Sequence, residues 1–278
     1  MLRTLIKYCI CAFLFSLSLN TITAQALQNC ATKNVAFQAG EEVRYKLYYN
    51  WNFVWVPAGE VVFSVEDIDG LLRFKAEGET YKSYEWFFDV NDVYESYVDP
   101  STLLPKVSVR DIQEGKFTLY DRVEFNRSSG EAYSQRGKSK DEAVYKDPVP
   151  IQSCVHDMLS VIYFARNLDY AGMSKNESFP VSIFLDNEVY PLEVRYKGVA
   201  NKKKIKGLGV FEAYVFSPAT IAGEVFKDGD EMKVWVSKDQ NRIPLLIESP
   251  IAVGSVKAVL MDYKGLRYEA PKKLNSKN

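Results

Sequence analysis

Alternating apolar and polar residues dominate the chain. From Val43 to Trp55 every second residue is apolar and mostly aromatic, which predicts one strand with a strongly apolar face. Val61–Val65 and Leu72–Ala76 alternate in the same way, and the "DIDG" between them predicts a hairpin turn. Further strand patterns, separated by turn signals, occur at 93–98, 107–109, 117–125, 181–185, 189–196, 209–216, 232–236, 243–248 and 255–263. This spacing predicts a mainly β fold, either a large curved antiparallel sheet or an incompletely closed β-barrel.

One segment follows a helical period instead. Apolar residues at 155, 158, 159, 162 and 163 predict one central helix, at about 153–168, packed on the sheet. Ser153 is a suitable N-cap, and Asp157 favours the N-terminal end of the helix dipole. The preceding segment, 128–150, is polar and irregular, and we expect either a strand pair or a long loop there.

Residues 1–26 have the pattern of a secretory signal peptide. A short basic start precedes an apolar run, and Ala24 and Ala26 supply the small residues of a cleavage site. The run is short for a membrane anchor, which needs about 20 apolar residues. We therefore expect an exported protein with one β-rich domain at 27–268, a disordered polar tail at 269–278, and no transmembrane span after cleavage.

Cleavage would remove Cys9 and Cys11 and leave Cys30 and Cys154. In an oxidising compartment a single disulfide between them is the simplest pairing, and two buried free thiols are the alternative. A disulfide that closes so long a loop would stabilise the protein by roughly 3–5 kcal/mol. His156 is the only histidine, which excludes a histidine-rich metal site. We expect no metal and no other cofactor.

Charge and motifs give little support to catalysis or to nucleic-acid binding. The chain has 278 residues, and its 35 Lys and Arg nearly balance 36 Asp and Glu, so no basic field attracts nucleic acid. His156 and Asp157 could serve a serine nucleophile, but no Gly-x-Ser-x-Gly motif occurs, and a structural histidine is the simpler interpretation. "KKKIK" at 202–206 is interpreted as a solvated hairpin; contact with anionic lipid or an acidic partner is the alternative.

The aromatic residues are more numerous than one sheet face requires. They could fill an ordinary core, or they could form the wall of a cavity for an apolar ligand. Burying each ring stabilises by roughly 2–3 kcal/mol in both cases, so energetics does not distinguish the two. The candidate ligand-binding residues are Tyr45, Tyr49, Trp51, Phe53, Trp55, Trp86 and Phe88.

Five segments between about Phe37 and Gly265 carry a family resemblance: "FQAGEEVRYKLYYNW", "AGEVVFSVED", "DVYESYVDPSTLLP", "SCVHDMLSVIYFAR" and "MKVWVSKDQNRIPLLIESPIAVGSVKAVL". In order and spacing they resemble the exported bacterial family catalogued as domain of unknown function 3108. That resemblance implies a β-rich fold and supplies no active site. The last segment is also similar to the late strands of periplasmic lipoprotein carriers and their outer-membrane receptors, which hold acyl chains on a concave sheet; the residues concerned are Trp235, Ile243, Pro244, Leu245 and Ile247.

These observations predict a non-enzymatic protein that binds a lipid-like or other apolar ligand in the concavity of its sheet. We expect it in the periplasm, or associated with the outer membrane, of a Gram-negative bacterium. An envelope protein-interaction scaffold without a ligand pocket is the main alternative, with an envelope protein as its partner. A hydrolase of cell-envelope material is a third interpretation, which would require a cleft with convergent carboxylates or His156.

Overall fold

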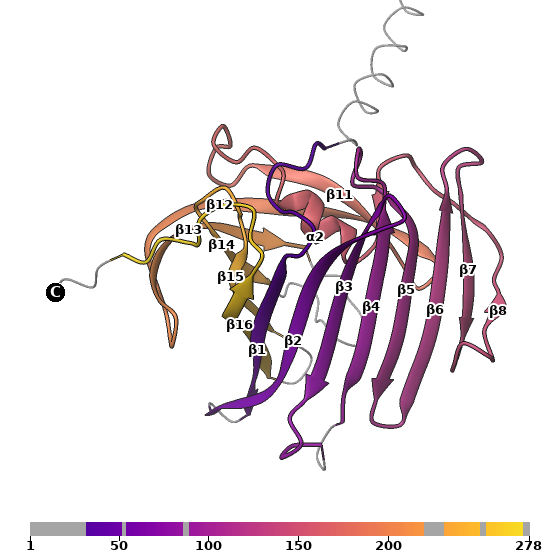
Figure 1. The fold of residues 1–278 in the computed structure, drawn as a ribbon, viewed down its shortest axis with the longest axis horizontal. Coiled ribbons are helices and arrows are strands. Elements are labelled where there is room, and N and C mark those ends of the chain that lie inside the picture. Colours follow the sequence, from indigo (N-terminus) through magenta and orange to yellow (C-terminus); the bar gives the residue numbers. More distant parts are fainter. Residues whose placement is uncertain (1–31, 52–53, 86–88, 220–230, 251–253, 275–278) are drawn as a thin grey trace, which may run out of the picture.

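One sheet of sixteen strands forms most of the protein in the computed structural model, which describes residues 32–51, 54–85, 89–219, 231–250 and 254–274 (Figure 1). The strand order is β10-β11-β12-β13-β14-β15-β16-β1-β2-β3-β4-β5-β6-β7-β8, and β9 pairs with β7. Every pairing is antiparallel except that of β10 with β11. The strands are β1 (Glu42–Trp51), β2 (Val54–Ile68), β3 (Leu71–Thr80), β4 (Asn91–Val98), β5 (Pro105–Glu114), β6 (Phe117–Asn126), β7 (Glu131–Gly137), β8 (Val144–Tyr145), β9 (Val149–Pro150), β10 (Val155–His156), β11 (Ser178–Leu185), β12 (Glu188–Ile205), β13 (Gly209–Pro218), β14 (Lys233–Ser237), β15 (Pro244–Pro250) and β16 (Ser255–Lys264).

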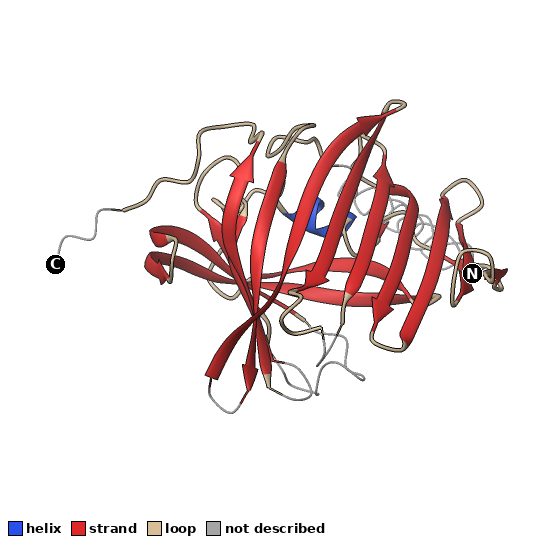
Figure 2. Ribbon diagram, turned by 60° about the horizontal axis from the view of Figure 1, so that its bottom comes forward, coloured by secondary structure: helices blue, strands red, loops and turns tan. Residues whose placement is uncertain are grey.

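The sheet curls into a barrel that its strands do not close, which confirms the predicted fold class (Figure 2). The two edges of the sheet, β10–β11 and β7–β9, face each other but are not paired. We call the boundary between them the seam. Side chains bridge the seam in place of backbone hydrogen bonds. The rings of Phe125 and Phe184 meet edge to face at 5.7 Å, and Arg110 and Arg136 both reach Asp186 at 2.7 Å.

The helix α2 (Ser160–Ala165) lies inside the curve of the sheet and is shorter than the predicted helix at 153–168 (Figure 1). The first part of that segment forms a strand because Val155 and His156 pair in parallel with β11. The carboxylate of Asp157 then accepts hydrogen bonds from the backbone N–H groups of Leu159 and Ser160, at 2.8 and 2.9 Å. The length of the helix predicted from apolar spacing is therefore too great at the N-terminal end, because residues there pair with β11 instead.

Aromatic packing fixes α2 against the inner face of the sheet. Tyr163 stacks on Phe74 of β3 at 3.9 Å and meets Phe37 edge to face at 4.9 Å. Phe37 belongs to the segment that precedes β1, and it is fully buried together with Ala36. Such ring pairs contribute about 0.5–1.5 kcal/mol each beyond the burial of their area. The half of the concavity that contains α2 is therefore a packed core.

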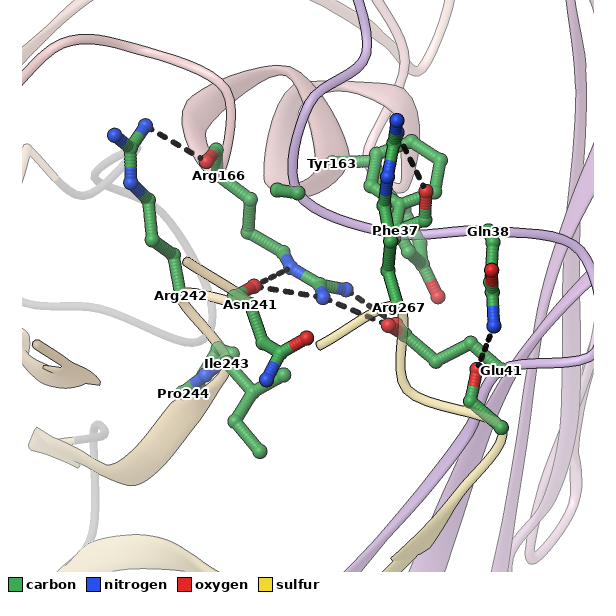
Figure 3. Close-up of polar contacts among 12 residues, drawn as sticks. Phe37, Gln38, Glu41, Tyr163, Arg166, Asn241, Arg242, Ile243, Pro244 and Arg267 are labelled. Atoms are coloured by element: carbon green, nitrogen blue, oxygen red, sulfur yellow. Dashed lines mark hydrogen bonds and ion pairs between the residues drawn. The ribbon is translucent and has the colours of Figure 1, made fainter. Parts of the chain in front are cut away.

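A buried ion pair ties the two ends of the domain to this helix (Figure 3). Arg166 follows α2 and contacts both carboxylate oxygens of Glu41, at 2.5 and 2.9 Å. It also donates to the backbone oxygen of Asn241. The side chain of Asn241 bonds in turn to the backbone of Tyr268 and Glu269, close to the C-terminus. The segment before β1, the helix, the β14–β15 turn and the C-terminal segment thus meet at one point.

The lysine-rich segment at 202–206 ends β12 and packs partly on the sheet. Ile205 is buried in a cluster with Phe211 and Trp235. The ammonium group of Lys203 lies 3.5 Å from the centre of the Trp235 ring. The chain beyond β16 also contacts this region, because the N–H of Leu274 donates to the oxygen of Val210 at 2.7 Å. Leu274, within the expected disordered tail, is thus in contact with β13.

Several predictions concern residues outside the described ranges. These are the signal peptide at 1–26 and Cys30, so the disulfide between Cys30 and Cys154 stays a prediction. None of the helices within the described ranges has the length and apolar character needed to cross a bilayer.

Candidate ligand site on the inner face

The aromatic row at 43–55 is divided between two strands. The predicted single strand is wrong at its C-terminal end, because β1 ends at Trp51 and the chain turns back into β2 at Val54. Residues paired across two strands lie on the same face. Tyr49 pairs with Val56, whereas Trp55 pairs with Asn50, so Tyr49 and Trp55 lie on opposite faces of the sheet.

The candidate residues therefore have different surroundings. Tyr45 is buried on the inner face, where its hydroxyl donates to the oxygen of Pro244 at 2.9 Å. Trp55 is on the outer face, with the ammonium group of Lys257 4.0 Å from its ring centre. Trp51 pairs with Val54 at the end of β1. The remaining three, Phe53, Trp86 and Phe88, lie outside the described residues.

Beside the packed core around α2, apolar side chains on the inner face of β16, β1 and β2 remain partly exposed. Strand pairing places them together, because Leu47 pairs with Ala258, and Tyr49 pairs with both Val56 and Val256. We call this surface the apolar wall: Leu47, Tyr49, Val56, Val61, Phe63, Val256 and Ala258. Val61 and Phe63 connect it to the core cluster around Tyr163. Val61, Phe63 and Ala258 also pack on the core cluster around Trp235, whereas Leu47, Tyr49, Val56 and Val256 are partly exposed and belong to neither cluster.

Two glycines close to the apolar wall differ in the space around them. Gly78 on β3 pairs with Val61, so it lies on the inner face next to the apolar wall. A Cβ at Gly78 would have Val61 as its nearest neighbour, at 4.0 Å. A Cβ at Gly59 would instead come within 2.2 Å of the backbone oxygen of Glu79. Gly59 is therefore needed for close approach of β2 and β3, whereas Gly78 provides space.

A row of polar residues crosses the inner face opposite the apolar wall. Tyr94, Arg110, Asp121 and Arg136 are successive cross-strand partners on β4, β5, β6 and β7, and we call them the polar row. Arg110 and Arg136 both contact the buried carboxylate of Asp121. Burial raises the pKa of the Tyr94 hydroxyl to about 12. The inner face thus has an apolar side on β16, β1 and β2 and a charged side on β4 to β7, with β3 between them; there Ala76 pairs with Tyr94 and Gly78 pairs with Asp92.

A small cavity lies at the polar row. Its lining includes Tyr94, Ser108, Asp121 and Asp157, and its volume is ≈20 Å³, about the space that one water molecule needs. On the same face of β4 as Tyr94, and two residues from it, burial raises the pKa of Asp92 to about 6. This region of the concavity therefore favours small polar groups.

The arrangement around His156 does not resemble a catalytic triad. The ring Nδ1 lies 3.2 Å from the hydroxyl of Ser160, and the carboxylate of Asp157 bonds to Ser96 and to two backbone N–H groups. The Asp157 carboxylate thus has other partners than the imidazole that it would orient in a triad. Burial lowers the pKa of His156 to about 3, assisted by the nearby charge of Arg127. The cluster anchors the start of α2.

The polar row is absent from the site residues predicted from the sequence. Arg110, Asp121 and Arg136 stand at positions that alternate in phase with inner apolar residues such as Ile112 and Val123. Charge at an inner-facing position was the available signal. It could be used only once the strand register had shown which positions face inward. Among the described residues, no group of three or more His, Cys, Asp or Glu side chains is arranged to hold a metal ion.

Comparisons with known proteins agree with this fold. The family described as "Protein of unknown function (DUF3108)" matches residues 44–261. The chain is also similar to a crystal structure of a β-barrel-like protein of domain of unknown function DUF1849 from Brucella abortus, with a TM-score of 0.54 and 10% sequence identity. That match covers 86% of this chain and 100% of the other. No curated protein sequence matches.

Proposed function

We propose that this chain, which belongs to the DUF3108 family of proteins of unknown function, binds a lipid-like or other apolar molecule in the concavity of its sheet. The ligand would lie along the apolar wall, below α2 and beside Gly78. The protein would act as a binding protein rather than an enzyme. It would be exported to the periplasm, or to the periplasmic side of the outer membrane, after removal of residues 1–26.

One observation carries this proposal. Leu47, Tyr49 and Val256 lie on the inner face and remain partly exposed. The same face is tightly packed where it meets α2. Exposed apolar surface on a concave face is typical of ligand-binding sites. Burying such a surface against an acyl chain would contribute about 25 cal/mol per Å².

Two single substitutions on β3 test the proposal. Gly78→Leu places a side chain into the concavity, and Glu79→Leu places the same side chain on the outer face of the same strand. We expect uptake of a fluorescent fatty acid by the unmodified protein and by Glu79→Leu, and strongly weakened uptake by Gly78→Leu. Native mass spectrometry of the protein from its own envelope fraction would identify the bound species. Equal uptake by both variants, or none by the unmodified protein, would contradict the proposal.

A second candidate function is the binding of an envelope protein. Val54, Phe117 and Tyr145 are large apolar residues that remain exposed at the ends or edge of the sheet. Exposed apolar residues of this kind are found at protein interaction sites. Cross-linking in the intact envelope, with and without Tyr145→Ser, would test this alternative. A partner captured by the unmodified protein and lost in the variant would favour it over ligand binding.

A further inference from the structure

Two arginines of the polar row share the same two carboxylate partners. Arg110 and Arg136 both contact Oδ2 of Asp121, and both lie 2.7 Å from Oδ1 of Asp186. Asp121 and Arg110 belong to neighbouring strands, whereas Asp186 reaches them across the seam from the β11–β12 turn. The guanidinium groups therefore form one anion-binding surface that a carboxylate of the protein itself occupies.

The two carboxylates differ in how readily an outside anion could replace them. The side chain of Asp121 is 2% exposed and is fixed on the inner face of β6, whereas that of Asp186 is 46% exposed. Asp186 also stands in a two-residue turn with Asn187, where both residues have positive φ angles of 52° and 62°. Such turns connect two strands at an exposed tip. Asp186 is thus the partner that a ligand could displace without disturbing the sheet.

Asp121 has an unmet hydrogen-bond requirement at the same place. Its Oδ1 atom is buried and has no hydrogen-bond partner among the described residues. A buried acceptor without a donor costs about 1–3 kcal/mol. The cavity of ≈20 Å³ that Asp121 lines with Tyr94 and Ser108 accommodates about one water molecule, or a hydroxyl or ammonium group of similar size.

We propose that Arg110 and Arg136 bind the anionic head group of the ligand in place of Asp186, and that Asp121 accepts a hydrogen bond from a hydroxyl or ammonium group next to that anion. Paired arginines suit a carboxylate or phosphate group because their N–H groups match its oxygens. This inference rests on the proposed function, since the apolar chain of the same molecule would lie on the apolar wall beyond Gly78. The ligand class is an anionic amphiphile.

Variants with opposite expected effects test the head-group site. Asp186→Asn removes the competing carboxylate, and we expect about tenfold tighter binding of a fluorescent fatty acid; Arg136→Gln should weaken that binding about tenfold. The methyl ester of the same fatty acid should bind both variants and the unmodified protein equally. Glu188→Gln is the matched control, because it removes a neighbouring exposed charge whose contact is with Tyr190. A 2-hydroxy fatty acid should bind more tightly than the plain acid.

The failures of the two proposals are distinguishable. If neither the acid nor the ester binds, the proposed function fails. If both bind, and neither Asp186→Asn nor Arg136→Gln separates acid from ester, only the head-group inference is overturned. Inorganic phosphate is the third probe. If it binds the Asp186→Asn variant while the fatty acid does not, the arginine pair takes free anions, and its assignment to a lipid head group is refuted. The opposite signs expected for the two variants exclude simple misfolding as the cause.

Discussion

The buried pair of Glu41 and Arg166 should give two single variants with different responses to pH. In Glu41→Gln, Arg166 keeps its charge at every accessible pH, because a guanidinium group loses its proton only above about pH 12. In Arg166→Met, the remaining carboxyl group can become neutral by taking up a proton. Lowering the pH should therefore reduce the stability loss of Arg166→Met relative to the unmodified protein. The stability loss of Glu41→Gln should not change.

The expected magnitudes follow from the burial and the geometry. The two side chains are 1% and 5% exposed and are joined by two hydrogen bonds, so water cannot replace a missing partner. Removing one member of such a pair costs about 3–5 kcal/mol. Protonating an ordinary glutamate costs about 4 kcal/mol at pH 7, and this cost falls by about 1.4 kcal/mol per pH unit. The ionic part of the Arg166→Met penalty should thus shrink to about 1 kcal/mol at pH 5.

Urea unfolding at pH 7 and pH 5, each compared with the unmodified protein, measures both effects. The double variant should lose less stability than the sum of the two single variants, since it leaves no unpaired charge. Arg44→Met is the control, because its partly exposed pair with Glu60 should contribute less than about 1 kcal/mol. Identical pH responses of the two single variants, or losses below 1 kcal/mol in both, would refute the reasoning.

Three further predictions concern stability. Folding lowers the pKa of His156 to about 3, so the imidazole is neutral in the folded protein. The free energy of unfolding should therefore fall as the pH drops below about 6.5, by about 3 kcal/mol at pH 4.5. Urea unfolding of His156→Gln should lack this part of the fall, and the same dependence of stability on pH in the variant would contradict the prediction. The raised pKa of Asp92, about 6, means that its ionised form is disfavoured by folding; Asp92→Asn should raise the melting temperature at pH 7.5 and give no gain at pH 4. Gly59→Ala should cost about 1–3 kcal/mol because its Cβ meets the oxygen of Glu79, whereas Gly78→Ala should be nearly neutral; equal losses would exclude the close approach as the cause.

Alternation along the chain predicted the strands well, but it did not predict which face every aromatic residue occupies. Alternation placed Tyr45 and Tyr49 correctly on one face, because the side-chain period of a strand is two. Trp55 was assigned to the same face because the alternation of apolar residues continues from Trp51 to Trp55 and hides the reversal of the chain between β1 and β2. The helix was overestimated at Val155, where a parallel partner about 27 positions later decides the conformation.

The candidate site could be predicted only in part. Its apolar residues follow from alternation in β1 and β2. The polar row depends on four strands in register and on Asp186, which approaches from the other side of the seam. Such a combination of distant positions has no signature in a single sequence. The signal peptide and the disulfide stay predictions, and peptide mapping without reduction, on protein purified from its own cells, would test both.

The pairing of β1 with β16 has a consequence for the order in which the protein folds. Residues 42–51 occupy the centre of the sheet, and one of their two neighbours is the last strand of the chain. Contacts between residues so far apart in sequence form slowly, because a long loop must close first. While the chain emerges in order, β1 can pair with β2 but has no partner on its other side until residue 264 has appeared. A growing chain therefore presents an unpaired, aromatic strand edge for most of its synthesis, and a holding chaperone would shield that edge at this stage.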